Sequence, residues 1–210
     1  MARRLWETAV PITSTPAAIY LLWRGVGLPA EVLQGTVLRY HSACPFRLEN
    51  GSTVKLPAML GAIVDIRTNE FCGIHRTALK PDGSGKADYP GLGSPKRMLG
   101  NVSGACIKLS ADDEVTFGLH VAEGIETALS CKVMGFRPIW AALSAGGIAR
   151  FPVLSGIETV TIMADNDASG TGLSAARDCA RRWVAAGREA IVLARSEAGR
   201  DWADPIGRGG

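Results

Sequence analysis

Short apolar runs alternate with segments of helical spacing through the second half of the chain. The runs have the length and bounding turn residues of buried strands. They lie at 117–122, 138–143, 159–164 and 190–194. Between them come a helical pattern at 125–133, a Gly-rich turn with a short helix at 145–154, and a helix carrying Leu173, Ala176, Ala180, Trp183 and Val184 on one side. This β-α-β-α-β-α-β order predicts an α/β fold with a parallel four-stranded sheet flanked by helices.

The first half has a less regular pattern, which predicts a smaller mixed α+β subdomain. Pro16 precedes an apolar stretch that ends at Gly25, as expected of a helix. Three strand-like runs follow, and a long loop rich in Gly and Pro separates the last of them from the second half. The runs lie at 37–40, 59–66 and 71–79, and the loop at 80–93. A polar run at 110–114 predicts a division into domains 1–113 and 114–210.

Composition narrows the class of protein. The 210 residues are 47% hydrophobic and carry a net charge of +3, as in ordinary globular proteins, so disorder is excluded. No apolar run approaches the length of a membrane span, and we expect no signal peptide at the basic but not apolar start. The five cysteines are scattered without a CxxC pair, which favours a cytoplasmic location and argues against a zinc site at Cys72 and His75.

Carboxylates follow three of the predicted strands. Glu123 follows the first strand of the second half, and Asp165 and Asp167 follow the third. Asp201 and Asp204 come after the last strand. Because parallel strands bring their carboxyl ends to one edge of a sheet, these side chains predict a site for Mg²⁺ or Mn²⁺. The alternative is that the Asp-x-Asp pair only forms a turn and helix cap.

Two of these segments resemble the motifs of the Toprim domain, which occurs in topoisomerases and primases. The stretches VAEGIETALS (Val121–Ser130) and IMADNDASGTG (Ile162–Gly172) each show an apolar strand that ends in the family's acidic residues. The resemblance implies that Asp165 and Asp167 hold metal ions. It also implies that Glu123 is a general base or a further metal ligand, two roles that one sequence does not separate.

Further stretches resemble the catalytic core of primases, in the variant found in plasmid and phage primase-like proteins. GRDWADPI (199–206) is similar to an acidic segment of that family and carries over Asp201 and Asp204 as metal ligands. CGIHRTAL (72–79) and SPKRMLG (94–100) are similar to its N-terminal subdomain, although Met98 replaces the usual aromatic residue. The basic residues of these two stretches are the expected nucleotide or DNA contacts: Arg76, Lys96 and Arg97.

The resemblance implies metal-dependent nucleotidyl transfer that makes short primers on single-stranded DNA from nucleoside triphosphates. Because the chain shows no zinc-binding module or P-loop, a separate zinc module or a helicase is left open as a partner. The alternatives are a Toprim nuclease and a non-catalytic protein that binds single-stranded DNA. A dinucleotide-binding enzyme is a further rival, because residues 170–175 fit G-x-G-x-x-A, but two carboxylates before that motif would repel a pyrophosphate.

Overall fold

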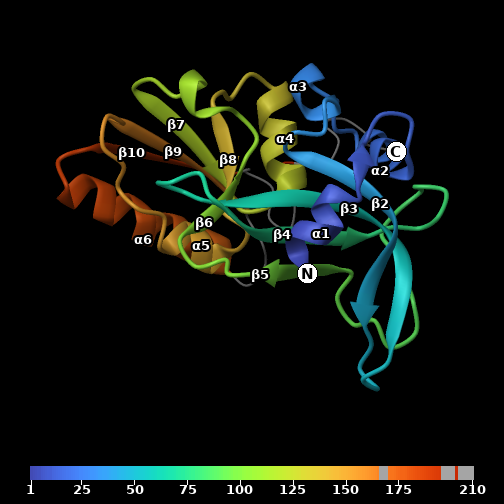
Figure 1. The fold of residues 1–210 in the computed structure, drawn as a ribbon. Coiled ribbons are helices and arrows are strands. Elements are labelled where there is room, and N and C mark those ends of the chain that lie inside the picture. The colour runs from blue at the N-terminus through green and yellow to red at the C-terminus, as the bar shows by residue number, and fades with distance from the viewer. Residues whose placement is uncertain (166–169, 195–201, 203–210) are drawn as a thin grey trace, which may run out of the picture.

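The computed structural model describes residues 1–165, 170–194 and 202 of the chain (Figure 1). A sheet of ten strands runs through both halves of this described part. Its order is β1-β2-β3-β6-β8-β7-β9-β10, with β4 paired to β3 and β5 paired to β4. Within the same residues, no helix is long and apolar enough to cross a membrane.

The strands divide between the two halves of the chain. Those of the first half are β1 (Val10–Pro11), β2 (Leu38–Arg47), β3 (Thr53–Asp65), β4 (Phe71–Ala78), β5 (Lys96–Gly100) and β6 (Ala105–Lys108). Those of the second half are β7 (Gly118–Ala122), β8 (Ile139–Ala141), β9 (Thr159–Ala164) and β10 (Glu189–Ala194).

The four strands of the second half form the parallel part of the sheet. β7 lies between β8 and β9, and β10 extends the sheet beyond β9, all in parallel. Residues 160–164 of β9 are buried on both faces, which is why this strand reads as a continuous apolar run rather than an alternating one. The predicted parallel four-stranded sheet is confirmed.

Helices cover both faces of this parallel part (Figure 1). Leu129 of the first helix shares an apolar core with Met163 of β9. Trp183 of the last helix shares a second core with Ile162, the neighbouring residue of the same strand. Because successive side chains of a strand point to opposite faces, the helices lie on opposite sides of the sheet. They are α4 (Ile125–Val133) on one side, and α5 (Ala145–Ala149) and α6 (Thr171–Ala185) on the other.

The first half adds short helices to an antiparallel set of strands. The predicted helix after Thr15 is α2 (Pro16–Trp23), with Pro16 in its first turn. Gly25 adopts a φ of 73°, and the next residue donates its backbone N–H to Leu21 O at 2.9 Å, so a left-handed residue ends the helix. Two further short helices are α1 (Ala2–Glu7) and α3 (Ala30–Leu33).

Strands β2 to β5 form an antiparallel series beside the second half. The hairpin of β2 and β3 is longer than predicted and projects from the body of the molecule (Figure 1). The sequence pattern did not predict β5 or β6, since both are short and carry lysine within their runs.

The junction between the halves is built into the sheet. β6 comes from the first half but pairs antiparallel with β8, through Ile107 opposite Ala141. A single turn of 3₁₀ helix, η1 (Asp112–Glu114), then leads to β7. In this turn a Glu114 carboxylate oxygen accepts the backbone N–H of Ala111 at 2.7 Å. The predicted domain division after residue 113 falls in this turn and stays a prediction.

Candidate active site

Two carboxylates stand at the carboxyl edge of the parallel strands. Ala122 of β7 lies opposite Met163 of β9 in parallel register, so Glu123 and Asp165 both follow the ends of neighbouring strands. Both side chains are half-buried. Helix α6 begins close to this edge, because a Cβ added at Gly172 would lie 2.7 Å from the Asp165 carbonyl oxygen. The sequence prediction that these two residues share one edge therefore agrees with their placement.

Trp202, the one residue of the predicted 199–206 acidic segment that the structure describes, contacts the same edge. The Trp202 indole nitrogen donates a hydrogen bond to Ala164 O at 3.1 Å, directly before Asp165. Its ring packs edge-on against Phe136, with ring centroids 6.1 Å apart.

Three of the predicted metal ligands, Asp167, Asp201 and Asp204, lie outside the described residues. Among the residues that the structure does describe, no group of three or more His, Cys, Asp or Glu side chains is arranged to hold a metal ion. The metal site, including the part played in it by Glu123 and Asp165, therefore stays a prediction.

Lys96 connects the first half of the chain to the second half beside this edge. Its Nζ lies 2.9 Å from Glu126 Oε2, in the first turn of α4 and three residues beyond Glu123. Lys86, from the loop after β4, places its Nζ 4.0 Å from Glu126 Oε1. Tyr20 of α2 donates its hydroxyl to the same oxygen at 2.9 Å. We call these four residues the Glu126 cluster.

Glu126 is ionised although it is 4% exposed. Burial alone raises the pKa of a carboxyl group, because it penalises the charged form. The charge and hydrogen bond of Lys96, a backbone N–H at the start of α4 and the charge of Lys86 outweigh burial and lower the pKa of Glu126 to about 2. The carboxylate is therefore a fixed negative charge beneath two ammonium groups at neutral pH.

The other two predicted nucleotide contacts, Arg76 and Arg97, bind backbone oxygens of the first half. Arg76 is 8% exposed, donates to Pro45 O at 2.6 Å and lies over the Phe46 ring. Arg97 donates to the carbonyl oxygens of Arg47, Ser94 and Leu92. Both arginines tie segments of the first half together, and their predicted contact with nucleotide or DNA stays a prediction.

Two polar side chains beside Lys96 have no partner among the described residues. His75 Nδ1 and Thr77 Oγ1 are buried without a hydrogen bond there, and Thr77 lies opposite Lys96 in the β4–β5 register. Burial lowers the pKa of His75 to about 4, while the charge of Glu126 acts in the opposite direction. His75 is therefore neutral at pH 7 and is a buried polar residue beside the Glu126 cluster.

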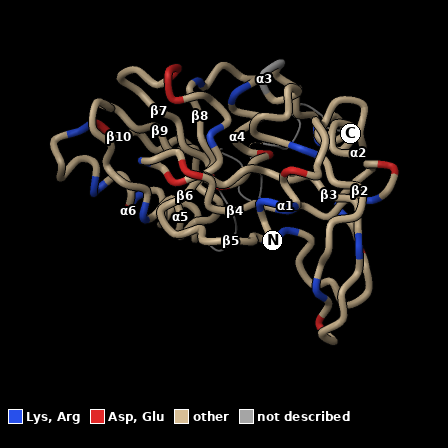
Figure 2. The backbone as a smooth tube through the Cα atoms, viewed as in Figure 1, with Lys and Arg blue, Asp and Glu red and all other residues tan. Residues whose placement is uncertain are grey.

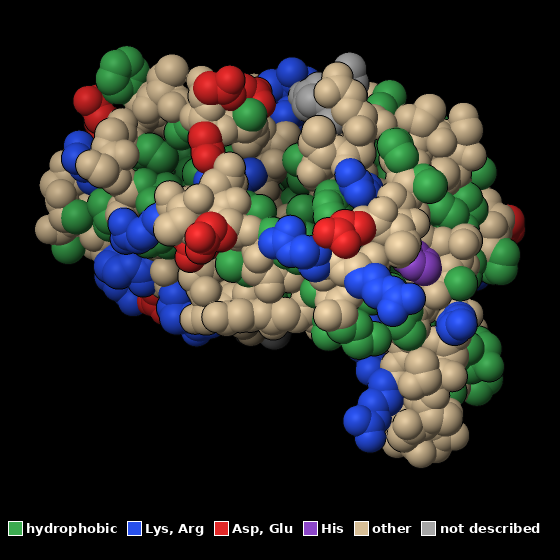
Figure 3. Space-filling view, viewed as in Figure 1, with side chains coloured by type: hydrophobic (Ala, Val, Ile, Leu, Met, Phe, Trp, Pro, Cys, Tyr) green, Lys and Arg blue, Asp and Glu red, His purple; other side chains and the backbone are tan. Residues whose placement is uncertain are grey.

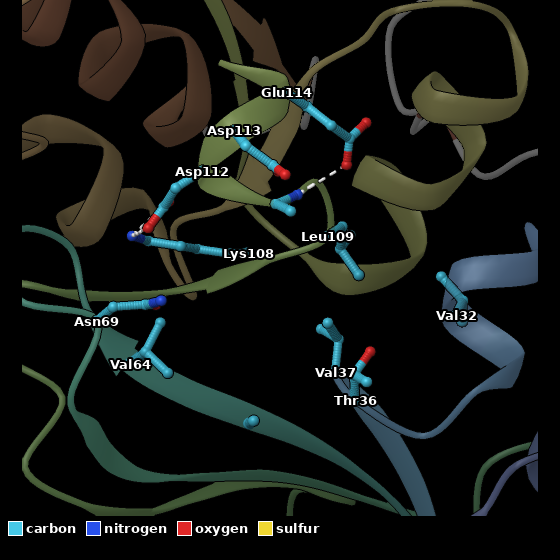
Figure 4. Close-up of a pocket in the computed structure, with 12 residues that line it drawn as sticks. Val32, Thr36, Val37, Val64, Asn69, Lys108, Leu109, Asp112, Asp113 and Glu114 are labelled. Carbon is cyan, nitrogen blue, oxygen red and sulfur yellow. Dashed lines mark hydrogen bonds and ion pairs between the residues drawn. The ribbon is translucent and has the colours of Figure 1, made fainter.

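A cavity of about 640 Å³ opens elsewhere, between β3, α3 and η1. Figure 4 shows Val37, Val64 and Leu109 pointing into it, with Asp112 paired to Lys108 at one side. None of the sequence-predicted site residues lines this cavity, so it is separate from the carboxyl edge.

Charged residues of both signs are spread along the backbone (Figure 2). On the face seen in Figure 3, basic side chains form separate groups with acidic ones between them, and no continuous basic stripe crosses this view.

Several solved primase structures share this fold. A DNA primase domain from Pseudomonas aeruginosa is 14% identical with a TM-score of 0.61, and the match covers 96% of this chain and 72% of that one. The DnaG catalytic core is 15% identical with a TM-score of 0.60, covering 96% and 70%. A DnaG primase catalytic domain bound to single-stranded DNA is 14% identical with a TM-score of 0.60, covering 96% and 72%.

Two family models divide the sequence between them. Residues 1–109 match the model described as a domain of unknown function, DUF7146. Residues 118–210 match the Toprim domain. This chain belongs to the DUF7146 family, carries a Toprim domain over residues 118–210, and has the fold of the primase catalytic domains. No curated protein matches this Toprim chain.

Sequence reasoning about this Toprim protein missed most of the Glu126 cluster. In the sequence, Glu126 has the pattern of an acid in the first turn of a helix, a position where acidic residues are common. Lys86 lies in the predicted loop, and Tyr20 lies 106 residues before Glu126. No local pattern indicates that these side chains meet, because their contact depends on how α2 and β5 pack against α4.

Proposed function

We propose that this chain catalyses metal-dependent nucleotidyl transfer of the DNA-primase type. A nucleotide 3′-hydroxyl would attack the α-phosphorus of an incoming nucleoside triphosphate on a single-stranded DNA template, and pyrophosphate would leave. One observation carries the proposal: Lys96 of the first half lies 2.9 Å from Glu126, three residues beyond Glu123 at the carboxyl edge. A cation for the phosphates therefore stands beside the carboxylate end of the sheet.

The residues at that edge suit a hard divalent cation. Glu123 and Asp165 supply carboxylate oxygens at neighbouring strand ends, which are the donors that Mg²⁺ and Mn²⁺ prefer. In this proposal Asp165 holds the metal together with the predicted ligands outside the described residues: Asp167, Asp201 and Asp204. A bound divalent ion supplies charge neutralisation and orientation of the phosphate oxygens.

Side chains of this chain would supply the proton transfer and the contacts with the triphosphate. Glu123 would either take the proton of the 3′-hydroxyl as a general base or serve as a further metal ligand. Lys96 would bind phosphate oxygens of the incoming triphosphate. The proposed template, single-stranded DNA, is supported by the bound DNA in one of the similar primase structures.

The test combines the full chain, single-stranded DNA and labelled nucleoside triphosphates with Mg²⁺ or Mn²⁺. We expect new oligonucleotides from the wild type and at least a 100-fold loss in Asp165→Asn, with an unchanged melting temperature. Asp178→Asn is the matched control, since Asp178 pairs with Arg181 on the exposed part of α6.

Other outcomes would overturn the primase assignment. Shortening of the DNA in place of synthesis would indicate a Toprim nuclease. DNA binding of equal affinity with and without the divalent metal, together with no product, would indicate a non-catalytic binding protein.

A further inference from the structure

The Glu126 cluster joins four separate segments at one carboxylate. Tyr20 comes from α2, Lys86 from the loop after β4, Lys96 from β5 and Glu126 from α4. The first three belong to the DUF7146 half and the fourth to the Toprim half. The carboxylate is therefore the point through which the Toprim half holds basic side chains of the other half.

The two lysines of the Glu126 cluster are more exposed to solvent than its carboxylate. The Glu126 side chain is 5% exposed, whereas the side chains of Lys86 and Lys96 are each 36% exposed. The carboxylate thus lies beneath the two lysines, and the lysines meet the solvent. A ligand that approaches the cluster reaches the ammonium groups and not the carboxylate.

The charges of the cluster do not balance. Two ammonium groups share one carboxylate. Burial lowers the pKa of Lys86 most, and the nearby charge of Lys96 lowers it further. Like charges held this close repel each other, so the arrangement gains from a ligand that carries several negative charges. A polyphosphate satisfies that condition.

The cluster also lies next to the proposed reaction centre. A Cβ added at Gly124 would lie 3.7 Å from Glu126 Oε2, the oxygen that accepts Lys96. Gly124 directly follows Glu123 in the chain. The lysines are therefore anchored within a few residues of the carboxylate edge.

We propose that Glu126 is a positioning residue, which holds Lys96 and Lys86 in place for the triphosphate of the incoming nucleotide. This inference rests on the proposed nucleotidyl transfer but concerns the nucleotide site alone. Glu126 does not touch the substrate. It acts by fixing two flexible lysine side chains before the nucleotide arrives, so that binding costs less side-chain entropy. Tyr20 orients the carboxylate through its other oxygen.

The most direct variant is Glu126→Asp, which keeps the negative charge and withdraws it by one methylene group. Binding of a nucleoside triphosphate to the full chain is measured with divalent metal but without DNA, so that no primer is made. We expect the dissociation constant to rise about tenfold, with the melting temperature followed in parallel. Asp112→Asn is the matched control, because it breaks the ion pair with Lys108, and we expect binding to change less than twofold.

A double-mutant cycle then tests whether Glu126 acts through Lys96. We expect Glu126→Gln and Lys96→Gln each to weaken triphosphate binding, and the double variant to lose less than the sum of the two single losses, with the remainder carried by Lys86. Additive losses would overturn the inference, since Glu126 would then act independently of Lys96. Tighter binding by Glu126→Gln would also overturn it, since the carboxylate would then only cancel positive charge.

Failure of the proposed function gives a different result from failure of this inference. If the wild type binds triphosphate, the Glu126 and Lys96 variants bind it more weakly as described, and no primer is made, the result contradicts the nucleotidyl transfer and supports the positioning role. A wild type that binds no triphosphate overturns the positioning role. Where the wild type does make primers, Glu126→Asp should raise the KM for the triphosphate and leave kcat nearly unchanged.

Discussion

The two faces of the β4–β5 pair use basic side chains in opposite ways. On one face Lys96 reaches across to Glu126 of the Toprim half, with its ammonium group open to solvent. On the other face Arg76 and Arg97 donate to backbone oxygens of their own half. Lys96 and Arg97 are neighbours in the chain, but successive side chains of a strand point to opposite faces, so the two make different contacts. Of the three predicted cations, Lys96 therefore contacts the Toprim half, whereas Arg76 and Arg97 bind backbone oxygens of their own half.

The residue types match these two tasks. The planar guanidinium group of an arginine can donate to several oxygens at once, as Arg97 does with three carbonyl groups. A lysine ammonium is a compact charge on a flexible chain, so a carboxylate is needed to fix it. The Glu126 cluster provides that carboxylate.

The largest expected effect separates the two neighbouring cations on β5. Lys96→Met should lower primer synthesis about 100-fold, since a charge-assisted contact to phosphate is lost, and should lower the free energy of unfolding by about 3 kcal/mol, since the buried Glu126 carboxylate loses its closest cationic partner. Arg97→Met should lower the free energy of unfolding by about 1 kcal/mol and reduce activity less than tenfold. Urea unfolding and primer synthesis on both variants check this. Equal losses of activity would remove the distinction between the faces.

Arg76 gives the next effect, on stability. Arg76→Met removes the donor to Pro45 O and the contact with the Phe46 ring, and leaves the half-buried carbonyl oxygen without that bond. We expect a loss of about 2 kcal/mol in the free energy of unfolding, with unchanged triphosphate affinity. Urea titration and triphosphate binding measure the two quantities. A stable variant that binds nucleotide poorly would place Arg76 in the nucleotide site after all.

The features that the sequence predicts, the parallel strands and the carboxylates after them, depend on local patterns of buried residues. Strand β9 is buried on both faces and β7 ends in the buried pair Val121 and Ala122, so both apolar runs have clear ends and the acidic residues after them stand out. That is why the sequence pattern puts Glu123 and Asp165 after neighbouring strands, which is where the β7–β9 register has them. The Glu126–Lys96 contact joins residues 30 apart, and it depends on the packing of β5 against α4. β5 itself has no clear pattern, because only part of the strand is buried.

The smallest expected effect is a pH dependence from the face that meets the Toprim half. His75 is buried there beside the Glu126 cluster, and burial lowers its pKa from 6.5 to about 4. The unfolded chain therefore binds a proton on this residue at a higher pH than the folded chain does. The stability that neutral His75 permits is fully present above pH 6.5 and is lost as the pH falls from 6.5 toward 4.

Urea unfolding of the wild type and His75→Gln at several pH values between 7 and 5 tests this dependence. We expect the free energy of unfolding of the wild type to fall by up to about 1.4 kcal/mol per pH unit more than that of the variant. Glu126 does not disturb this range, because its folded pKa of about 2 lies below its ordinary value of 4.5, and its stabilising effect is lost only as the pH falls from 4.5 toward 2. Parallel curves for the two proteins would show that His75 is not buried in neutral form.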